Sequence, residues 1–150
     1  MIIRTEGNLF DCGADALVNP VNTQGVMGAG LAREFKTRYP SMFKAYATRC
    51  TQGDLRYGVV HVWLNEAGRP RYILNVPTKE DWRNRSSLNG IRLSLAALAR
   101  TVAELQIHSV AVPALGCGRG GADWGQVRPL IVNAFEAVPD EVMVFLFEPR

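Results

Sequence analysis

Apolar residues recur every three or four positions between residues 88 and 105, which is the spacing of one face of a helix. The series consists of Leu88, Ile91, Leu95, Leu98, Val102 and Leu105. Just ahead of it, the hydroxyl of Ser86 or Ser87 can accept a hydrogen bond from a free amide of the first turn, as an N-cap does. The pattern predicts a long helix with one buried face.

Short apolar runs bounded by turn residues predict strands that are buried on both faces. Residues 14–21 and 109–115 are two such runs, and each leads into a glycine-rich stretch. Residues 142–147 form a third run, and Ile2 and Ile3 begin a short strand. A hairpin is predicted from the runs at 59–63 and 72–76, because residues 65–68 supply turn chemistry between them.

Helices are predicted between these strands. One spans about Leu31 to Tyr39. After Pro40, a second helix places four residues on one face: Met42, Phe43, Tyr46 and Ala47. Asp123 can cap a further helix, with Gln126 three residues later as in a capping box.

Buried strands that alternate with helices indicate an α/β sandwich with a largely parallel central sheet, which the hairpin makes mixed. The 150 residues suit one domain, and we expect it to span residues 1–150. In such sheets ligands bind beyond the carboxyl ends of the strands. The glycine-rich stretches at those ends are therefore the candidate functional loops.

Composition narrows the class of protein. Hydrophobic residues make up 47% and charged residues 21%, which is typical of a soluble globular domain. No apolar run approaches the roughly 20 residues that span a membrane, and the N-terminus lacks a signal peptide's apolar region. We expect a cytoplasmic protein without membrane contact. The net charge of +3 is compatible with a polyanionic ligand.

The cysteines and histidines do not suggest a metal or a catalytic triad. Cys12, Cys50 and Cys117 are odd in number and have no CxxC spacing, which argues against a disulfide framework and a zinc site. His61 and His108 fall in apparent strands far apart in the sequence, where a structural or surface role is expected. We expect no metal and no cofactor.

Two loops carry the candidate chemistry. The first glycine loop, residues 22–30, has three glycines, and the second, residues 115–121, has four. Glycine lets the backbone approach a ligand, and amides at a following helix start can bind phosphate. The first loop matches neither the P-loop nor GxGxxG, so a tight strand-to-helix turn is the alternative. Two such loops at one sheet edge suit a ligand with two phosphates.

The motifs Asn19-Pro-Val-Asn22, Gly28-Ala-Gly30-Leu-Ala and Pro113-Ala-Leu-Gly116-Cys-Gly118 resemble the macrodomain family over essentially the whole chain. The resemblance implies a three-layer α/β/α fold that binds ADP-ribose in a cleft on top of the sheet. The loops would wrap the diphosphate and the distal ribose. The implied ADP-ribose contacts are Asn8, Leu9, Asn22, Gly28, Ala29, Gly30, Thr78, Leu115, Gly116, Cys117, Gly118, Arg119, Gly120 and Phe147.

Some of these residues have a structural alternative. Asn22 would bond the distal ribose hydroxyls or close an Asx turn, whereas Asn19 is expected to hold the loop. Cys117, between glycines, is read as a small loop filler and not as a nucleophile. Phe147 is a candidate neighbour of adenine. Trp124 and Phe147 either flank the ligand or fill the core.

A narrower resemblance is carried by residues 26–30 with Phe35-Lys36, by Asn75-Val-Pro-Thr78-Lys79 and by residues 116–124. These stretches are similar to the branch that contains human terminal ADP-ribose glycohydrolase and the bacterial DarG antitoxins. The pair Gly120-Gly121, and Asp81-Trp82 after the lysine, favour the DarG type. That type removes ADP-ribose from thymidine bases of single-stranded DNA and so reverses a DarT-like toxin, a form of DNA repair.

The sequence departs from the family at two places. Many macrodomains have an aspartate, which accepts from the adenine amino group, where this chain has Asn8. An amide oxygen can still accept, but the charge is lost. The human enzyme pairs its lysine with an aspartate in the second loop, where this chain has Gly120 and Gly121. A mechanism that needs that aspartate cannot be carried over.

Lys79 is the catalytic candidate that the resemblance implies; by itself, a lysine after Pro77-Thr78 would be a solvated turn residue. A neutral amine could attack the anomeric carbon and form a Schiff base, or a charged amine could stabilise the departing base or orient water. Trp82, Arg83 and Arg85 are candidate DNA contacts through stacking and phosphate pairing. Their alternative is a solvated loop before a helix.

Two other functions remain open. The chain could hydrolyse ADP-ribose esters of protein carboxylates or O-acetyl-ADP-ribose, or it could be a reader that binds ADP-ribose without cleaving it. DarG proteins usually carry a second, C-terminal domain, and no segment of this sequence matches one, so the chain is either a piece of a longer protein or a stand-alone relative. We expect a monomer whose partners are ADP-ribose, ADP-ribosylated single-stranded DNA and a DarT-like toxin.

Overall fold

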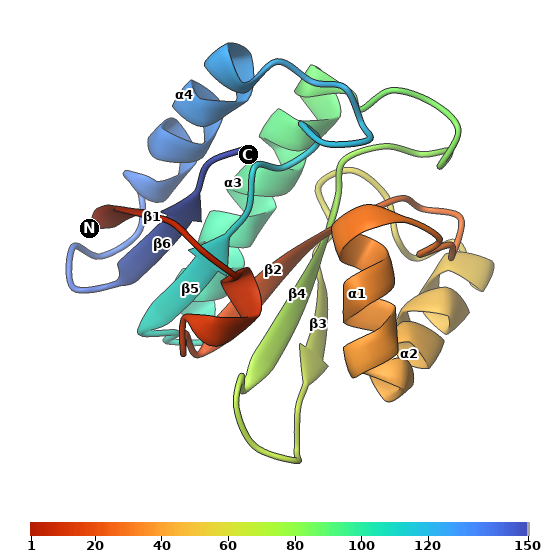
Figure 1. Cartoon of the computed structure of the whole chain (residues 1–150), viewed down its shortest axis with the longest axis horizontal. Helices are drawn as coiled ribbons and strands as arrows, with labels where there is room; N and C mark the ends of the chain where they lie inside the picture. Colours follow the sequence, from red (N-terminus) through yellow and green to blue (C-terminus); the bar gives the residue numbers. More distant parts are fainter. Residues whose placement is uncertain (150) are drawn as a thin grey trace.

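The computed structural model describes residues 1–149 and consists of one sheet between helices (Figure 1). The strands are β1 (Ile2–Thr5), β2 (Ala16–Val21), β3 (His61–Leu64), β4 (Tyr72–Pro77), β5 (Ser109–Val112) and β6 (Met143–Phe147). The helices are α1 (Gly30–Arg38), α2 (Pro40–Thr51), α3 (Leu88–Glu104) and α4 (Trp124–Phe135), with a 3-10 turn, η1, at Leu9–Asp11.

The sheet is mixed and largely parallel, as predicted. Its spatial order is β1-β6-β5-β2-β4-β3. Every neighbouring pair is parallel except β3 and β4, which form the predicted antiparallel hairpin. The edge strand β3 is therefore the element that makes the sheet mixed.

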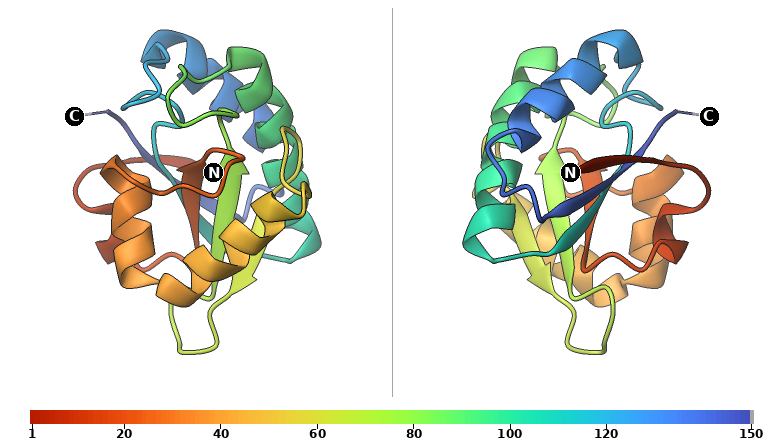
Figure 2. Two further views of the ribbon diagram at one scale, coloured as in Figure 1. Left: turned by 90° about the vertical axis from the view of Figure 1, so that its right-hand side faces the viewer. Right: turned by 90° about the vertical axis from the view of Figure 1, so that its left-hand side faces the viewer.

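Helices cover both faces of the sheet (Figure 2). Successive side chains of a strand point to opposite faces. Ala16 and Val18 of β2 accordingly pack with α3 and α4, whereas Leu17 and Val21 pack with α1 and α2. The expected three-layer α/β/α arrangement is confirmed.

The long helix α3 forms as its pattern predicts. The Ser87 hydroxyl accepts a hydrogen bond from the amide of Gly90 at 2.9 Å, so Ser87 is the N-cap. The buried face includes Ile91, Leu95, Leu98 and Val102, which belong to the core shared with α4. At the ends of the series, Leu88 is only partly buried and Leu105 is exposed.

Two strands are shorter than their apolar runs. β2 begins at Ala16 and not at residue 14, since the Asp15 amide donates to the Ser109 hydroxyl instead of joining the sheet. β5 ends at Val112, because Pro113 has no amide hydrogen to donate. His108 precedes β5, so placing it inside a strand was wrong.

The capping box expected at α4 is also wrong. Asp123 is the N-cap residue of that helix, but its side chain makes no cap hydrogen bond. Its main-chain oxygen accepts from the amides of Gln126 and Val127, each at 3.0 Å. The first turn of α4 is thus joined to Asp123 through the backbone.

Strands β2 and β5 separate toward their carboxyl ends. The two strands pair only through Ala16 with Val110 and Leu17 with Ala111, so the rest of β2 diverges from β5 (Figure 1). The chain leaves β2 into α1 on one face and leaves β5 into α4 on the other. Such a switch point, beyond the carboxyl ends of the strands, is where open α/β sheets bind ligands.

Candidate functional site

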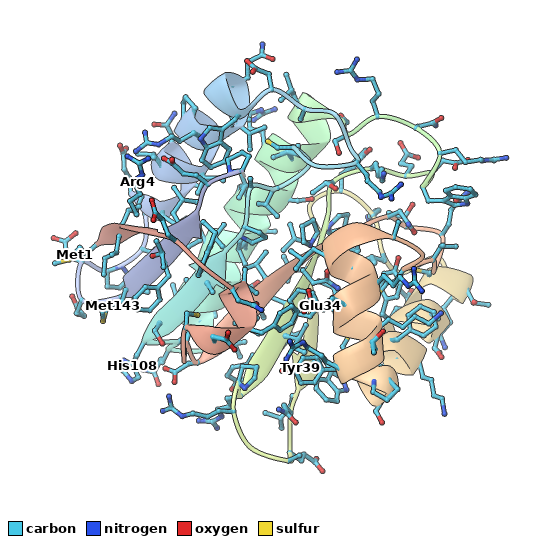
Figure 3. The ribbon with its side chains drawn as sticks, viewed as in Figure 1. Met1, Arg4, Glu34, Tyr39, His108 and Met143 are labelled. Atoms are coloured by element: carbon cyan, nitrogen blue, oxygen red, sulfur yellow. The ribbon has the colours of Figure 1, made fainter. Side chains whose placement is uncertain are left out.

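A cleft of about 1510 Å³ lies at this end of the sheet. Arg4 of β1 and Glu34 of α1, both labelled in Figure 3, line two of its sides. Most of the predicted site residues also line it: Asn8, Leu9, Asn22, Gly28, Ala29, Gly30, Thr78, Lys79, Trp82, Arg83, Gly116, Cys117, Gly118, Arg119, Gly120 and Phe147. The fold brings together residues from every part of the chain that sequence reasoning selected.

Two predicted site residues lie elsewhere. Leu115 does not line the cleft, and its side chain is completely buried in the core shared by α3 and α4. The guanidinium of Arg85 donates to the main-chain oxygen of Gly121, and Arg85 lines a separate hollow. Leu115 thus supports the second loop from below, and Arg85 holds that loop from the side.

The first glycine loop is held by the Asn22 side chain. Its oxygen accepts from the amide of Gln24 at 2.9 Å, and its amide group donates to the main-chain oxygen of Val26 at 2.7 Å. The hydroxyl of buried Tyr46 lies 2.7 Å from the main-chain oxygen of Asn22 and 2.9 Å from its side-chain oxygen. Burial raises the pKa of Tyr46 far above its ordinary value, so the hydroxyl stays neutral as a donor. Asn22 therefore closes an Asx turn while lining the cleft.

A buried polar network lies below this loop. The Asn19 amide donates to the Asn75 side-chain oxygen at 3.0 Å and lies 3.7 Å from the sulfur of Met27 in the loop. The Asn75 amide lies 2.9 Å from Nδ1 of His61. Burial first, and then the charge of Arg49, lower the pKa of His61. His61 is thus a structural histidine, and Asn19 contacts the loop from below.

The second glycine loop packs against Ser86, which sequence reasoning missed as a site residue. A Cβ on Gly116 would lie 2.9 Å from the Ser86 Cβ and 2.8 Å from Cδ1 of Ile91. A Cβ on Gly120 would lie 2.6 Å from the Gly116 main-chain oxygen and would overlap the Ser86 hydroxyl. The two glycines thus make room for Ser86. In the sequence, the high glycine content of residues 115–121 indicated a close approach of other atoms to this loop, but it did not identify Ser86 as the neighbouring side chain.

The bridging segment, residues 79–86, ties the two loops together. On one side the amide of Thr23 donates to the Glu80 oxygen at 3.2 Å, and the amide of Trp82 donates to the Gln24 side chain at 3.4 Å. On the other side the amide of Ser86 donates to the Gly120 oxygen at 2.8 Å. The segment that carries Lys79 therefore has a position fixed by both loops.

Lys79 is half-buried at the wall of the cleft, and its amine is bonded within the bridging segment. Nζ donates to the main-chain oxygen of Trp82 at 3.2 Å. Among residues 1–149 it forms no ion pair with an acidic side chain. Gly120 and Gly121 stand where the human enzyme has an aspartate, and no other acidic side chain of the described residues pairs with the Lys79 amine in its place.

The other cations of the cleft differ in how they are paired. Arg83 binds Asp81 with a 2.7 Å ion pair, and this guanidinium holds the Asp81 pKa well below its usual range. Arg4 pairs with Glu148 at 2.9 Å. Arg119 makes no ion pair within the described chain, and its Cδ lies 4.0 Å from the position of a Cβ on Gly30. Arg119 is therefore available to an anion between the two loops.

Cys117 lines the cleft as a protonated thiol. Burial first, and then the charge of Asp123, raise the pKa of Cys117 to about 11. A thiolate is the nucleophilic form, so this environment favours the filler interpretation. Within residues 1–149 no group of three or more His, Cys, Asp or Glu side chains could hold a metal ion, and no helix is long and apolar enough to cross a membrane.

At the far end of the cleft, Asn8 caps η1. Its side-chain oxygen accepts from the amide of Phe10 at 2.9 Å, which leaves one lone pair for another donor. Leu9 and Phe147 line the cleft with small exposed edges. Trp124 instead packs against the core of α3 and α4. Exposed His108 lies at the opposite end of the sheet (Figure 3).

Comparison with known proteins matches residues 18–131 to the model of the Macro domain. A Mycobacterium tuberculosis protein named DNA ADP-ribosyl glycohydrolase is 45% identical over 141 residues, covering 93% of this chain and 40% of that protein. The solved macrodomain of Mycobacterium tuberculosis DarG superposes with a TM-score of 0.96 at 43% identity, covering 100% of this chain and 99% of that one.

A second solved structure, Thermosipho africanus DarTG in complex with ADP-ribose, superposes with a TM-score of 0.92 at 31% identity. It covers 99% of this chain and 41% of that chain. The chain spans about 40% of the length of the curated DNA ADP-ribosyl glycohydrolases that it matches.

Proposed function

The chain belongs to the macrodomain family, and from that premise we propose that it binds ADP-ribose in its cleft and removes it from thymidine bases of single-stranded DNA. Residues 1–150 would act as one macrodomain of the DarG type and reverse the modification made by a DarT-like toxin. The observation that carries the proposal is the position of Lys79. Lys79 lines the cleft, on a segment that both glycine loops hold.

The two loops suit the diphosphate and the distal ribose. Residues of both loops and of the start of α1 line the cleft, where their main-chain amides would bind phosphate, and Arg119 has no anionic partner within the described residues. The side chain of Asn22 has one remaining amide hydrogen, which would reach a ribose hydroxyl. Adenine would lie near Leu9 and Phe147, with Asn8 accepting from its amino group. The similarity to a protein solved in complex with ADP-ribose supports ADP-ribose as the ligand.

Two routes for Lys79 fit this geometry. In the first, a neutral Nζ bonds to the anomeric carbon as the bond to the base breaks, and the base leaves with a proton. The bond from the ring oxygen to that carbon then breaks to give an imine with the opened sugar, which water hydrolyses to free ADP-ribose and the amine. In the second, the charged amine stabilises the departing base while water attacks. The first route needs no carboxylate partner in the second loop, which agrees with Gly120 and Gly121 at that position.

The DNA would leave the cleft past Trp82. This side chain is 53% exposed on the bridging segment, as expected of a ring on which a base can stack. Arg83 would meet phosphate only by exchanging Asp81 for it, since the two are already paired. On this proposal the domain works as a monomer in the cytoplasm, in DNA repair, and a DarT-like toxin is its functional partner.

The decisive experiment uses a single-stranded oligonucleotide with ADP-ribose on one thymine, and reads the products by mass. We expect wild-type protein to release ADP-ribose and Lys79→Ala to be at least about 100-fold slower, because the reacting group is gone. Lys44→Ala, which removes an exposed lysine of α2, is the matched control and should retain full activity.

Two additions separate the remaining possibilities. Lys79→Arg keeps a cation but cannot form an imine, so residual activity supports the charged route, and a borohydride-trapped adduct on Lys79 supports the imine. If the protein releases ADP-ribose only from carboxylate esters or from O-acetyl-ADP-ribose, then these compounds, and not DNA, are its substrates. Binding of ADP-ribose without release from any substrate would make the chain a reader.

A further inference from the structure

A second hollow of about 450 Å³ lies on the other side of the bridging segment. We call it the side hollow. It is lined by Thr23 and Gln24 of the first loop, by Tyr57, and by Asn84 with three charged neighbours on the bridging segment, Glu80, Asp81 and Arg85. Lys79, Trp82, Arg83 and Ser86 of the same segment line the cleft. One thickness of chain therefore separates the two cavities.

The side hollow offers the groups that recognise the edge of a nucleobase. Carboxamides present a donor and an acceptor side by side, as base edges do. The Asn84 side chain makes no hydrogen bond within the described part of the chain, although its main-chain amide donates to the Asp81 oxygen. Gln24 uses its oxygen to accept from the Trp82 amide, and its NH₂ group is also bonded to the Asp81 carboxylate, which leaves one of its two hydrogens to donate.

An aromatic ring forms another wall. The ring of Tyr57 lies directly on α3, where a Cβ on Gly90 would come within 2.5 Å of it, so this glycine lets the ring lie flat against the helix. Burial first, and then the charge of Glu80, raise the pKa of Tyr57, so its hydroxyl remains neutral. Nucleobases bind to such combinations of aromatic surface and amide groups.

The charges in the side hollow select a neutral group over a phosphate. Two carboxylates, Glu80 and Asp81, and one guanidinium, Arg85, line the side hollow, so two negative charges and one positive charge leave its lining with a formal charge of −1. Glu80 has no ion-pair partner among residues 1–149, and Arg85 keeps its positive charge while it donates to the Gly121 oxygen. A phosphodiester placed beside Glu80 would be repelled, whereas a base would not.

We propose that the side hollow receives the nucleobase adjacent to the ADP-ribosylated thymine, with Asn84 and Gln24 contacting its edge. The proposal rests on the proposed function, because it requires a DNA strand that passes over the bridging segment. With the modified thymine at Lys79, the next nucleotide reaches the side hollow by crossing Trp82. The domain would then recognise two successive nucleotides, one on each side of the segment.

The test measures binding by fluorescence anisotropy, with Lys79→Ala protein so that no substrate is consumed. Three short oligonucleotides carry ADP-ribose on one thymine: one is intact, and the others have an abasic residue on the 5′ or the 3′ side. We expect one abasic oligonucleotide to bind about tenfold more weakly than the intact one. Adding Asn84→Ala should weaken binding of the intact oligonucleotide about fivefold. The same substitution should leave the affinity for that abasic oligonucleotide and for free ADP-ribose unchanged.

Asn133→Ala, which removes an exposed asparagine of α4, is the matched control and should change no affinity. Equal affinity for all three oligonucleotides, or an equal loss for intact and abasic strands with Asn84→Ala, would overturn the base-binding site. Because affinity is measured without turnover, failure of this site is distinct from failure of the proposed function, which is shown by wild-type protein that releases no ADP-ribose.

Discussion

The two glycine loops hold their shapes by different means. The first is fixed by polar groups, with the Asn22 side chain and the Tyr46 hydroxyl satisfying its backbone. The second also accepts hydrogen bonds from Ser86 and Arg85, but it is distinguished by close packing, because Gly116 and Gly120 leave no room for a side chain beside Ser86. An added methyl group at Gly116 or Gly120 would therefore meet atoms that have no space to move into. Substitutions in the first loop should therefore destabilise the fold by leaving polar groups unsatisfied, and substitutions at Gly116 or Gly120 should do so by steric overlap.

The largest effect is expected from Gly120→Ala. The new methyl group would overlap the Ser86 hydroxyl and the Gly116 oxygen, and overpacking of this kind costs about 3 kcal/mol. We expect a lower free energy of unfolding in urea and weaker ADP-ribose binding. Gly118→Ala is the control in the same loop, since a Cβ there has no heavy atom within 4 Å. Equal destabilisation by both variants would contradict the packing account.

An intermediate effect is expected from Asn22→Ala in the first loop. The variant leaves the Val26 oxygen, the Gln24 amide and the Tyr46 hydroxyl with fewer partners, and an unsatisfied buried group costs about 2 kcal/mol. Tyr46→Phe removes the hydroxyl alone and should cost about 1 kcal/mol. Thermal unfolding of both variants, with ADP-ribose titrated by calorimetry, checks the order. A larger loss for Tyr46→Phe would show that the hydroxyl, and not the amide, fixes the loop.

Local patterns predicted the elements that depend on local physics. The spacing of apolar residues in α3 and the Ser87 cap determine that helix almost by themselves. Strands that are apolar on both faces predicted the largely parallel sheet between helices, and the family resemblance implied its three layers. Element ends were less predictable, since β5 stops where Pro113 cannot donate and β2 starts where Asp15 bonds a serine from another strand. Such ends depend on partners that are distant in sequence.

The same distinction applies to the site. The glycine density of residues 115–121 indicated a close approach of backbone, but it did not identify Ser86, which lies about thirty positions earlier in the chain. Leu115 was selected by its place in a motif, yet its side chain points into the core. The side hollow could not be predicted, because Tyr57, Gln24 and Asn84 share no motif and meet only in the fold.

The smallest effect is expected from Cys117→Ala. This substitution tests whether the second loop has a structural role without supplying a nucleophile. The fold raises the thiol pKa from its ordinary 9.0 to about 11, so the protonated thiol is the form that the folded loop favours. The protonated thiol of Cys117 therefore contributes fully to folding stability below pH 9.0, and this contribution is lost as pH rises through about 11.

At neutral pH we expect slow alkylation of Cys117 by iodoacetamide, measured by mass, and unchanged turnover after Cys117→Ala. In urea the same cysteine should react with a midpoint near its ordinary value, which serves as the control. Rapid alkylation of the folded protein near pH 7, accompanied by loss of activity, would mean that the second loop supplies a nucleophile. The second loop would then differ from the first in its chemistry as well as in its packing.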